Sequence, residues 1–322
     1  MGKEKNVFAA DIPTLLGKEI RDTFYLAAIK STQAEAASWM ELNLKDRTGS
    51  VVGRIWAEYI EPQYFEYEHQ IVEVIGRVEI YRDRYELRVV KLMPVEQGQY
   101  LRTDYVEELP SDKAMEYVDN IKESIGAMKD ERLKALCFRV MTAQIIQKMS
   151  LLPLESPYCY AYAGGLLAHV SDMLSVAERA LEVNRRSNRS VKDTDADLVR
   201  AGIIMYSVGT LKQFKFDSVS YWRINRGKLV GVAAETVAQL AIMNQSLSHD
   251  KKVQDMTQIT HVIMALNGAV EPQTKEAVTA CMARDMICAM AAWDECFYSH
   301  ERKGRELTRV SSKYFGHEIE KG

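Results

Sequence analysis

A tryptophan and several arginines in the first 95 residues are the side chains with the clearest binding chemistry. Trp56 follows Arg54 by two positions in the run SVVGRIWAEY, so in an extended chain both side chains lie on one face. An aromatic ring can stack on a nucleic-acid base, and an arginine can contact a phosphate. Neighbouring runs supply further candidates for the same face, namely Trp39, Asn43, Arg82, Arg84 and Arg88. These residues predict a surface that binds single-stranded RNA or DNA.

The charge of the chain limits this prediction. The 322 residues contain 42 Lys and Arg against 45 Asp and Glu, a net charge of −3, and residues 11–95 contain 11 basic and 14 acidic side chains. Because phosphate contacts usually dominate nucleic-acid affinity, any such binding has to come from a local surface. Two alternatives therefore stay open: the surface binds peptide, or Trp56 closes a hydrophobic core and the arginines are solvated.

Cysteine and histidine spacing argues against a simple metal motif. The five cysteines form no CxxC pair, so neither a zinc knuckle nor a disulfide framework is predicted, and buried free thiols are expected. One literal His-Asp pair occurs, His249-Asp250, within the polar segment NQSLSHDKK. We expect that pair to lie on the surface by coincidence.

The elements that must position the candidate face are β-strands. Five runs rich in β-branched and aromatic residues follow one another, and in the second run Met40, Leu42 and Leu44 alternate with polar residues, which predicts one wet face. A tight turn at 46–49 joins the second and third runs. Five strands with an insertion between the third and fourth match an OB-fold barrel. The runs cover residues 23–31, 37–45, 50–59, 70–81 and 84–93.

The remainder of the chain is predicted to be helical. We expect multidomain α and β architecture, in which a five-stranded OB barrel (1–95) and a linker (96–112) precede an all-α domain (113–305) and a C-terminal tail (306–322). Ser111 and Asp112 are predicted to cap the first helix. Apolar spacing predicts helices at 111–128, 130–149, 164–186, 194–206, 229–248, 255–267 and 273–300.

Two stretches of sequence resemble a known family. LKDRTGSVVGRIW resembles the OB signature of single-strand binding proteins and of the N-terminal domain of YhaM-type 3′-5′ exoribonucleases, in which the aromatic seven residues after the Gly, here Trp56, can stack on a base. The order of blocks in the helical part resembles the C-terminal HD domain of the same family. The matching blocks are YCYAYAGGLLAHV, RAGIIMYSVGTLKQF, NRGKLVGVAAE, HVIMALNGAVEPQTKEAV and ARDMICAM.

This resemblance implies a degenerate metal site. An HD site holds a divalent metal with two His and two Asp around a water that becomes the attacking hydroxide. His169 and Asp285 match two of these ligands, whereas Tyr206 and Ser207 stand where the family has His-Asp. A phenol and a neutral hydroxyl replace imidazole and carboxylate poorly. Other departures are Cys159 and Tyr160 for a His pair, Thr210 for Lys, Lys228 for His, and Leu266 and Asn267 for a second His pair.

The resemblance and these departures together favour a catalytically inactive relative of OB/HD exoribonucleases. It would bind single-stranded RNA or DNA through its OB face and act as an accessory or regulatory protein, without a cofactor. His169, Tyr206, Ser207 and Asp285 would be vestigial metal positions, where Asp285 pairs with His169 or with neighbours of Arg284. Family analogy also implies a homo-oligomer, and a protein partner is a further expectation.

Two other functions stay open. An active Mn- or Mg-dependent exoribonuclease or phosphodiesterase could use a rearranged site drawn from His169, Asp217, His261 and Asp285. A protein–protein adaptor could bind peptide in the OB groove. Arg185, Arg186, Arg189 and Lys192 would form a basic patch or, alternatively, a solvated loop. The sequence has neither an apolar run of membrane-spanning length nor a signal-peptide pattern, so we expect a cytoplasmic protein without membrane contact.

Overall fold

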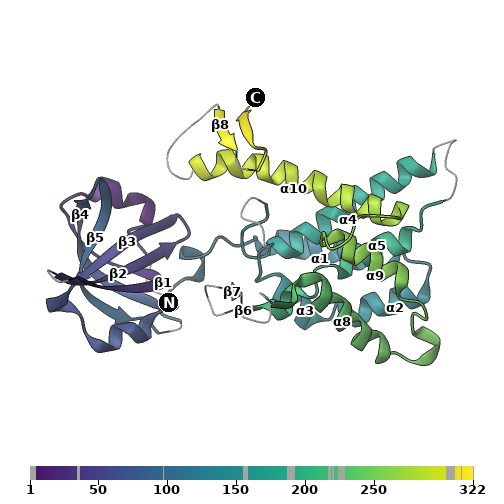
Figure 1. The fold of residues 1–322 in the computed structure, drawn as a ribbon, viewed down its shortest axis with the longest axis horizontal. Coiled ribbons are helices and arrows are strands. Elements are labelled where there is room, and N and C mark those ends of the chain that lie inside the picture. Colours follow the sequence, from purple (N-terminus) through teal and green to yellow (C-terminus); the bar gives the residue numbers. More distant parts are fainter. Residues whose placement is uncertain are drawn as a thin grey trace. The chain divides into compact units, whose positions relative to one another are not determined.

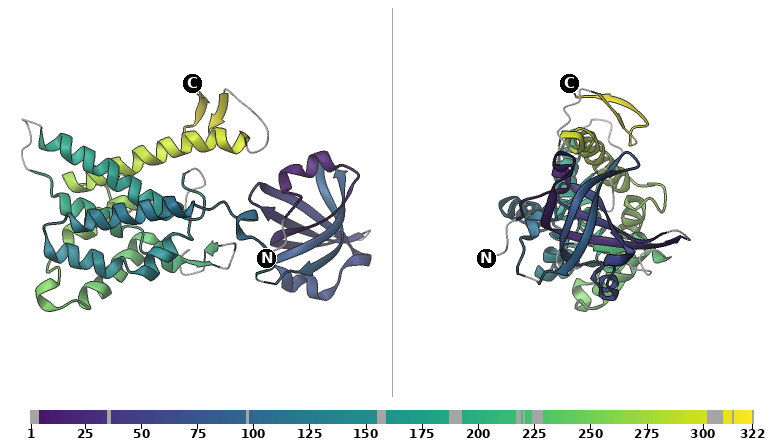
Figure 2. Two further views of the ribbon diagram at one scale, coloured as in Figure 1. Left: turned by 180° about the vertical axis from the view of Figure 1, so that it is seen from behind. Right: turned by 90° about the vertical axis from the view of Figure 1, so that its left-hand side faces the viewer.

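The chain forms a β-barrel unit and a helical unit, which are described separately (Figures 1 and 2). The boundary between the two compact units falls after Glu107. This agrees with the predicted fold class, a five-stranded barrel followed by a helical domain. The computed structural model describes residues 5–34, 37–96, 98–154, 159–186, 193–216, 219, 221–223, 229–301, 309–312 and 314–321.

The barrel closes in the strand order β1-β2-β3-β5-β4. All neighbouring strands are antiparallel except β3 and β5, and β1 pairs with both β2 and β4 to complete the barrel. The short 3-10 helices η2 (Ala57–Tyr59) and η3 (Pro62–Tyr67) fill the connection between β3 and β4. The strands are β1 (Glu19–Ala34), β2 (Ala37–Asp46), β3 (Gly49–Trp56), β4 (Ile71–Tyr81) and β5 (Arg84–Pro94).

Alternation along the strands determines the barrel core. Met40, Leu42 and Leu44 of β2 are fully buried, as their spacing predicts, while the residues between them lie on the outer face. Phe24, Val74 and Leu87 from other strands complete the same apolar interior. The outer face of β2, β3 and β5 therefore carries the side chains that are available for binding.

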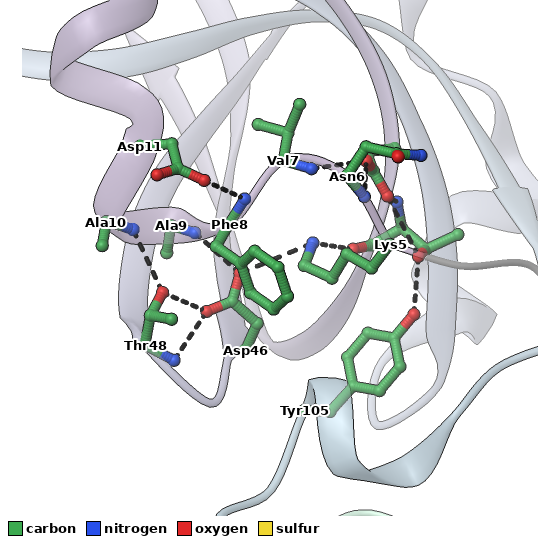
Figure 3. A network of polar contacts seen from close by, with 12 residues as sticks. Lys5, Asn6, Val7, Phe8, Ala9, Ala10, Asp11, Asp46, Thr48 and Tyr105 are labelled. Carbon is green, nitrogen blue, oxygen red and sulfur yellow. Dashed lines mark hydrogen bonds and ion pairs between the residues drawn. The ribbon is translucent and has the colours of Figure 1, made fainter.

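A polar network holds the turn between β2 and β3 (Figure 3). Asp46 accepts hydrogen bonds from the backbone N–H of Thr48 (2.9 Å), from its hydroxyl (2.6 Å) and from the N–H of Ala9 (2.7 Å). The Nζ of Lys5 lies 3.5 Å from Asp46 Oδ2 and 3.5 Å from the centroid of the Phe24 ring. Burial lowers the pKa of Lys5, and nearby carboxylates oppose that change. The network fixes the register of the β2–β3 hairpin.

Part of the predicted linker packs on the barrel. Tyr105 is buried and its hydroxyl donates a hydrogen bond to Thr23 Oγ1 at 2.6 Å. The backbone N–H of Arg47 donates to the carbonyl of Asp104, at the end of η4 (Arg102–Asp104). Desolvation raises the pKa of Tyr105. The barrel unit therefore includes residues beyond the last strand.

The helical unit contains the expected helices with two local differences. The predicted helix 130–149 is broken at Met141, whose ψ of 58° leaves the helical region, and Thr142 caps the second piece. Pro110 precedes the first helix without a side-chain cap, so the cap predicted at Ser111 is wrong. The helices are α1 (Ser111–Gly126), α2 (Glu131–Val140), α3 (Ala143–Met149), α4 (Gly165–Arg185), α5 (Ala196–Met205), α6 (Thr210–Gln213), α8 (Val232–Gln245), α9 (Thr257–Leu266) and α10 (Lys275–Glu301), with η5 (His249–Lys251).

The helices α4 and α5 are central to the helical core. Every residue of α5 from Leu198 to Met205 except Arg200 is buried, and α4 contributes a long buried stripe that packs on α1 and α5. Two short hairpins complete the unit, β6 (Phe214–Phe216) with β7 (Tyr221–Arg223), and β8 (Arg309–Ser312) with β9 (His317–Glu320). The second hairpin lies in the predicted tail, where Val310 and Ile319 pack against Phe297 of α10.

Candidate functional site

The outer face of the barrel brings most of the predicted binding residues together. Trp39 of β2 and Trp56 of β3 are register partners, and their ring centroids lie 6.0 Å apart with the planes tilted by 60°. Both rings are half-buried, so each keeps an exposed part. Asn43, four residues further along β2, lies on the same face opposite Val52. This end of the face offers two adjacent aromatic surfaces.

Arg54 occupies the middle of the face and is held by protein groups. It is 8% exposed, and its guanidinium lies 3.2 Å from Glu86 Oε2 and 3.8 Å from Glu41 Oε2. It also lies over the ring of Tyr81, 4.0 Å from the centroid, and 5.6 Å from that of Trp39. Desolvation raises the pKa of Glu86, and the positive charge of Arg54 opposes that rise. Arg54 therefore orders the aromatic rings around it.

The other three arginines lie at the β4–β5 end of the face and are exposed. Arg82 and Asp83 form a two-residue turn with φ of 47° and 61°, the positive values typical of a type I′ hairpin. Arg84 pairs with Tyr81 across this hairpin, and Arg88 lies next to Arg54 across the parallel β3–β5 pair. Arg88 Nη1 is 3.8 Å from Glu79 Oε1, an exposed ion pair of the kind that contributes little to stability.

A cavity of about 780 Å³ in the helical unit lies where the family motifs predict the metal site. Its wall combines α4, α10, the turn after α5, the start of α8 and the end of α9. The four predicted vestigial positions all line it, together with four of the substituted positions of the motif blocks. These residues are Cys159, His169, Tyr206, Ser207, Thr210, Leu266, Asn267 and Asp285.

His169 projects from α4 with both ring nitrogens engaged. The Tyr206 hydroxyl lies 2.6 Å from Nδ1, and Cys288 Sγ lies 3.3 Å from Nε2. Burial, and secondarily the charge of Arg284, lowers the pKa of His169 to about 3. Burial also raises the pKa of Tyr206. The histidine is therefore a neutral ring fixed by a tyrosine and a thiol.

The residues in the other altered positions also make internal contacts. The Asn267 amide donates to the carbonyls of Tyr206 (3.1 Å) and Ile263 (2.9 Å). Thr236 Oγ1 donates to the same Tyr206 carbonyl at 3.1 Å and accepts from Gly209 N–H at 2.9 Å. These bonds hold the turn after α5, so the backbone is supported where the family carries its His-Asp pair.

Cys288 is a residue of this site that sequence reasoning missed. Its Sγ lies 3.2 Å from Cys159 Sγ, and the thiol contact with Cys159, followed by burial, raises the pKa of Cys288. The available signal was its position on α10 three residues after Asp285, which places both side chains on neighbouring parts of the helix surface. The site thus contains a pair of thiols in contact beside the imidazole.

Asp285 does not form the expected pair with His169. Its carboxylate is mostly exposed and accepts hydrogen bonds from Arg284 Nε (2.8 Å) and Nη2 (2.6 Å). Arg284 also donates to the carbonyl of Leu266. Asp285 is therefore paired with Arg284, its neighbour in the chain.

The structure also places residues of the alternative hypotheses. His261 Nε2 accepts a hydrogen bond from Gln273 N–H at 2.9 Å, and His261 is not among the residues that line the cavity. His249 and Asp250 are exposed in η5, in agreement with a surface coincidence. Arg185 and Arg186 lie at the end of α4. The predictions for Asp217, Arg189, Lys192 and Lys228 lie outside the described residues.

The donor set of the cavity does not fit a hydrolytic divalent metal. Such a metal needs imidazole and carboxylate donors with open coordination positions. His169 has both nitrogens engaged, Asp285 is paired with Arg284, and Ser207 contributes only a neutral hydroxyl. Within the described ranges, no three His, Cys, Asp or Glu side chains are arranged as metal ligands.

Comparisons with known proteins point to one group of relatives. The chain is 22% identical over 261 residues to the 3′-5′ exoribonuclease YhaM of Oceanobacillus iheyensis, covering 80% of this chain and 78% of that protein. The corresponding protein of Bacillus pumilus is 23% identical over 291 residues, with 88% of each chain covered. YhaM of Bacillus subtilis is 24% identical over 263 residues, with 79% of this chain and 80% of that protein covered.

Other comparisons add little. No protein-family model matches the chain. Among solved structures, an OBody bound to hen egg-white lysozyme matches 30% of this chain and 98% of its own at 16% identity, but its TM-score of 0.24 carries no argument. No helix in the described part of the chain combines the length and apolarity needed to cross a bilayer. The resemblance predicted from the motifs is thus confirmed at the level of whole chains: this protein is similar to the YhaM-type 3′-5′ exoribonucleases over most of its length.

Proposed function

We propose that this chain binds single-stranded RNA on the outer face of its barrel and takes part in RNA processing. The proposal is supported by relatives named 3′-5′ exoribonucleases, which match 79 to 88% of the chain. A closed barrel with an exposed aromatic face supports it independently. The observation that carries it is the register pair Trp39–Trp56, because two half-exposed rings on adjacent strands provide stacking surfaces for successive bases.

In this proposal, different residues of the outer barrel face stack on bases and contact phosphates. Base stacking on an aromatic ring contributes about 1–3 kcal/mol per base and tolerates any sequence. Because the guanidinium of Arg54 forms ion pairs with Glu41 and Glu86, this side chain supports the aromatic rings and does not contact phosphate. The phosphate contacts fall to the exposed side chains of Arg82, Arg84 and Arg88. With about three phosphate contacts, the logarithm of the affinity would fall with the logarithm of the salt concentration with a slope of about −2.

A titration of labelled RNA tests this proposal. Trp56→Ala is expected to weaken binding of a single-stranded RNA oligonucleotide by about 5- to 150-fold, the equivalent of one lost stacking contact. Phe65→Ala serves as the matched control, because Phe65 is an exposed aromatic on η3, outside the strand face. Fluorescence anisotropy with RNA, DNA and duplex RNA would rank the ligands. Undiminished affinity of Trp56→Ala would remove Trp56 from the site, and absence of binding by the wild type would favour a peptide-binding adaptor.

We further propose that the helical cavity does not hydrolyse RNA, so that the chain acts as an accessory or regulatory protein. Support comes from His169, whose two nitrogens contact Tyr206 and Cys288, and from Asp285, whose charge is compensated by Arg284. A positioned hydroxide requires a metal with several anionic or imidazole donors. In this proposal the cavity is kept because its residues pack the helices together.

An active metal-dependent 3′-5′ exoribonuclease is the second candidate function. It is favoured by the names of the relatives and by the presence of His169 and Asp285 in the wall of one cavity. A nuclease assay on single-stranded RNA with added Mn²⁺ or Mg²⁺, together with metal analysis of the purified protein, separates the two candidates. If the wild type contains stoichiometric metal and hydrolyses RNA, and His169→Ala does not, the chain is an enzyme. That result would refute the proposal that the helical cavity does not hydrolyse RNA.

A further inference from the structure

Two thiols touch in the wall of the helical cavity, and neither takes part in the proposed function. Cys159 Sγ lies 3.2 Å from Cys288 Sγ, although the two cysteines are 129 positions apart in the chain. Cys159 belongs to the segment before α4, whereas Cys288 belongs to α10. The contact therefore joins two separate parts of the cavity wall through their sulfur atoms.

The two sulfur atoms need to move little to form a covalent bond. The S–S length of a disulfide is about 2.05 Å, so the sulfurs of Cys159 and Cys288 would approach each other by about 1.2 Å. Rotation about the Cα–Cβ bond of a cysteine moves its sulfur while the backbone stays in place. Both cysteines belong to the helical unit, so the bond would form within one compact body.

The cavity gives a small oxidant access to this pair. Both cysteines line it, and its wall also includes the exposed residues Ala269 and Asp285. Cys288 is half-buried, whereas Cys159 is 3% exposed. Cys288 is therefore the sulfur that an oxidant in the cavity reaches first, and Cys159 is the sulfur already in contact with it.

We propose that Cys159 and Cys288 form an oxidation site, at which a peroxide converts the two thiols into a disulfide that a thiol reductant reverses. In the first step, the sulfur of Cys288 attacks one oxygen of hydrogen peroxide. An S–O bond forms, the O–O bond breaks, and the second oxygen leaves as water with the thiol proton. Cys288 is then a sulfenic acid.

The second step forms the disulfide. The sulfur of Cys159 attacks the sulfenic sulfur of Cys288, so that an S–S bond forms and the S–O bond breaks. The hydroxyl group leaves as a second water with the proton of the Cys159 thiol. The two thiols together lose two electrons, and one molecule of peroxide takes them up.

The neighbours of the pair determine which step is slow. Contact with Cys159, followed by burial, raises the pKa of Cys288, so little thiolate is present and the first step is slow. His169 Nε2 lies 3.3 Å from Cys288 Sγ and orients this sulfur. A nucleophile that is already in contact reacts faster than one that must arrive from solution. The sulfenic acid should therefore be captured by Cys159 before a second peroxide oxidises it to sulfinic acid.

The disulfide would act as a crosslink within the helical unit. It would join positions 129 apart and close a loop that contains α4, α5, α8 and α9. A crosslink over a long loop restricts the unfolded chain more than the folded one. For a unit of this size, the melting temperature should rise by about 10 °C.

Peptide mass spectrometry of the full-length chain tests the proposal. The reduced protein is treated with hydrogen peroxide and a chelator, the remaining thiols are alkylated in denaturant, and trypsin digests the product. Cys159 then lies in peptide 149–179, and Cys288 lies in peptide 285–302 together with Cys296, so fragmentation has to assign the bonded sulfur. We expect these two peptides to be linked through Cys288 and to separate again in dithiothreitol.

Two variants and one internal standard complete this experiment. Cys281→Ser is the matched control, because Cys281 is a buried cysteine of the same helix outside the pair, and it should give the linked peptides as the wild type does. Cys159→Ser should instead accumulate sulfinic acid on Cys288. Met282 is 65% exposed, so its sulfoxide reports that the peroxide dose was sufficient. Absence of linked peptides at that dose, or sulfinic acid on Cys288 of the wild type, would overturn the proposal.

Thermal unfolding followed by circular dichroism tests the crosslink. The oxidised wild type should melt about 10 °C above the reduced wild type, and dithiothreitol should remove the difference. Oxidised Cys159→Ser should melt no higher than its reduced form, and both reduced proteins should show the same helical spectrum. Equal melting temperatures of the oxidised and reduced wild type, with the disulfide present by mass, would overturn the inference that this bond holds the cavity wall together.

Discussion

The protonation state of His169 leads to a quantitative prediction about stability. Its imidazole is 1% exposed, and its pKa is lowered from 6.5 to about 3, first by burial and then by Arg284. When the pH falls below about 6.5, the unfolded chain takes up a proton on this histidine, whereas the folded chain does not. The stabilising contribution is therefore present above the unfolded pKa and is lost as the pH falls toward 3.

The magnitude follows from the two pKa values. Between about pH 7 and about pH 5, the unfolded state gains most of one proton while the folded ring stays neutral, which costs about 2 kcal/mol of unfolding free energy. Because pH 5 lies far above the folded pKa of about 3, this loss is determined almost entirely by the unfolded state. Replacing His169 by Gln removes the titrating group and should remove this part of the pH dependence.

Urea unfolding followed by helical circular dichroism measures the effect. The wild type should lose about 2 kcal/mol more stability than His169→Gln over this pH range, and a chelator should not alter the difference. Other titrating groups contribute to both proteins, so they cancel in the comparison. The ionisable side chains that face the imidazole are Tyr206, Cys288, Tyr160 and Arg284, and burial or hydrogen bonding raises the pKa of the first three.

Two results would refute this reasoning. Equal pH dependence in the wild type and in His169→Gln would mean that the folded protein protonates His169 as readily as the unfolded chain does. A pH dependence that changes with a chelator would mean that His169 binds a metal, because metal binding competes with protons for the imidazole.

Two further substitutions test the packing of each unit by thermal unfolding. Gly202→Ala would place a Cβ 2.3 Å from Val262 Cγ1, so we expect a loss of about 1–3 kcal/mol that Val262→Ala partly restores; an unchanged melting temperature would contradict the close contact of α5 and α9. Asp46→Ala removes the carboxylate beside buried Lys5 and should destabilise the barrel by about 3–5 kcal/mol. If Asp46→Ala lowers the unfolding free energy by no more than an exposed Asp→Ala change does, the network in Figure 3 is not required for the stability of the barrel.

Alternation allowed the barrel to be predicted in some detail. In an extended strand successive side chains point to opposite faces, so the spacing of Met40, Leu42 and Leu44 was enough to identify the buried face of β2. The same rule placed Trp39 and Asn43 on the outer face, where the register pairs Trp39 with Trp56. Sequence alone could not show that the charge of Arg54 is paired with a carboxylate, because Glu86 reaches it from β5 across the parallel pair β3–β5.

The helical unit was predicted less completely. Apolar spacing located most helices, but the break at Met141 has no Pro or Gly to mark it, and its local signal is Thr142, which caps the next helix. The hairpin of β8 and β9 is held by contacts with Phe297 on α10 and has no strong local pattern. Cys288 was overlooked for a related reason, since its contacts with Cys159 and His169 span more than one hundred residues of sequence.

Local periodicity in the sequence determined the order of the strands and most helices and the outer aromatic face. The resemblance to the family, carried by motif order, pointed to eight of the positions that line the helical cavity. Only the tertiary structure decided what the side chains in the cavity do. It pairs Asp285 with Arg284 and directs Tyr206 and Cys288 to His169. The physical reason is that a donor's availability depends on which neighbour lies within hydrogen-bond distance, and folding brings together neighbours that are distant in the chain.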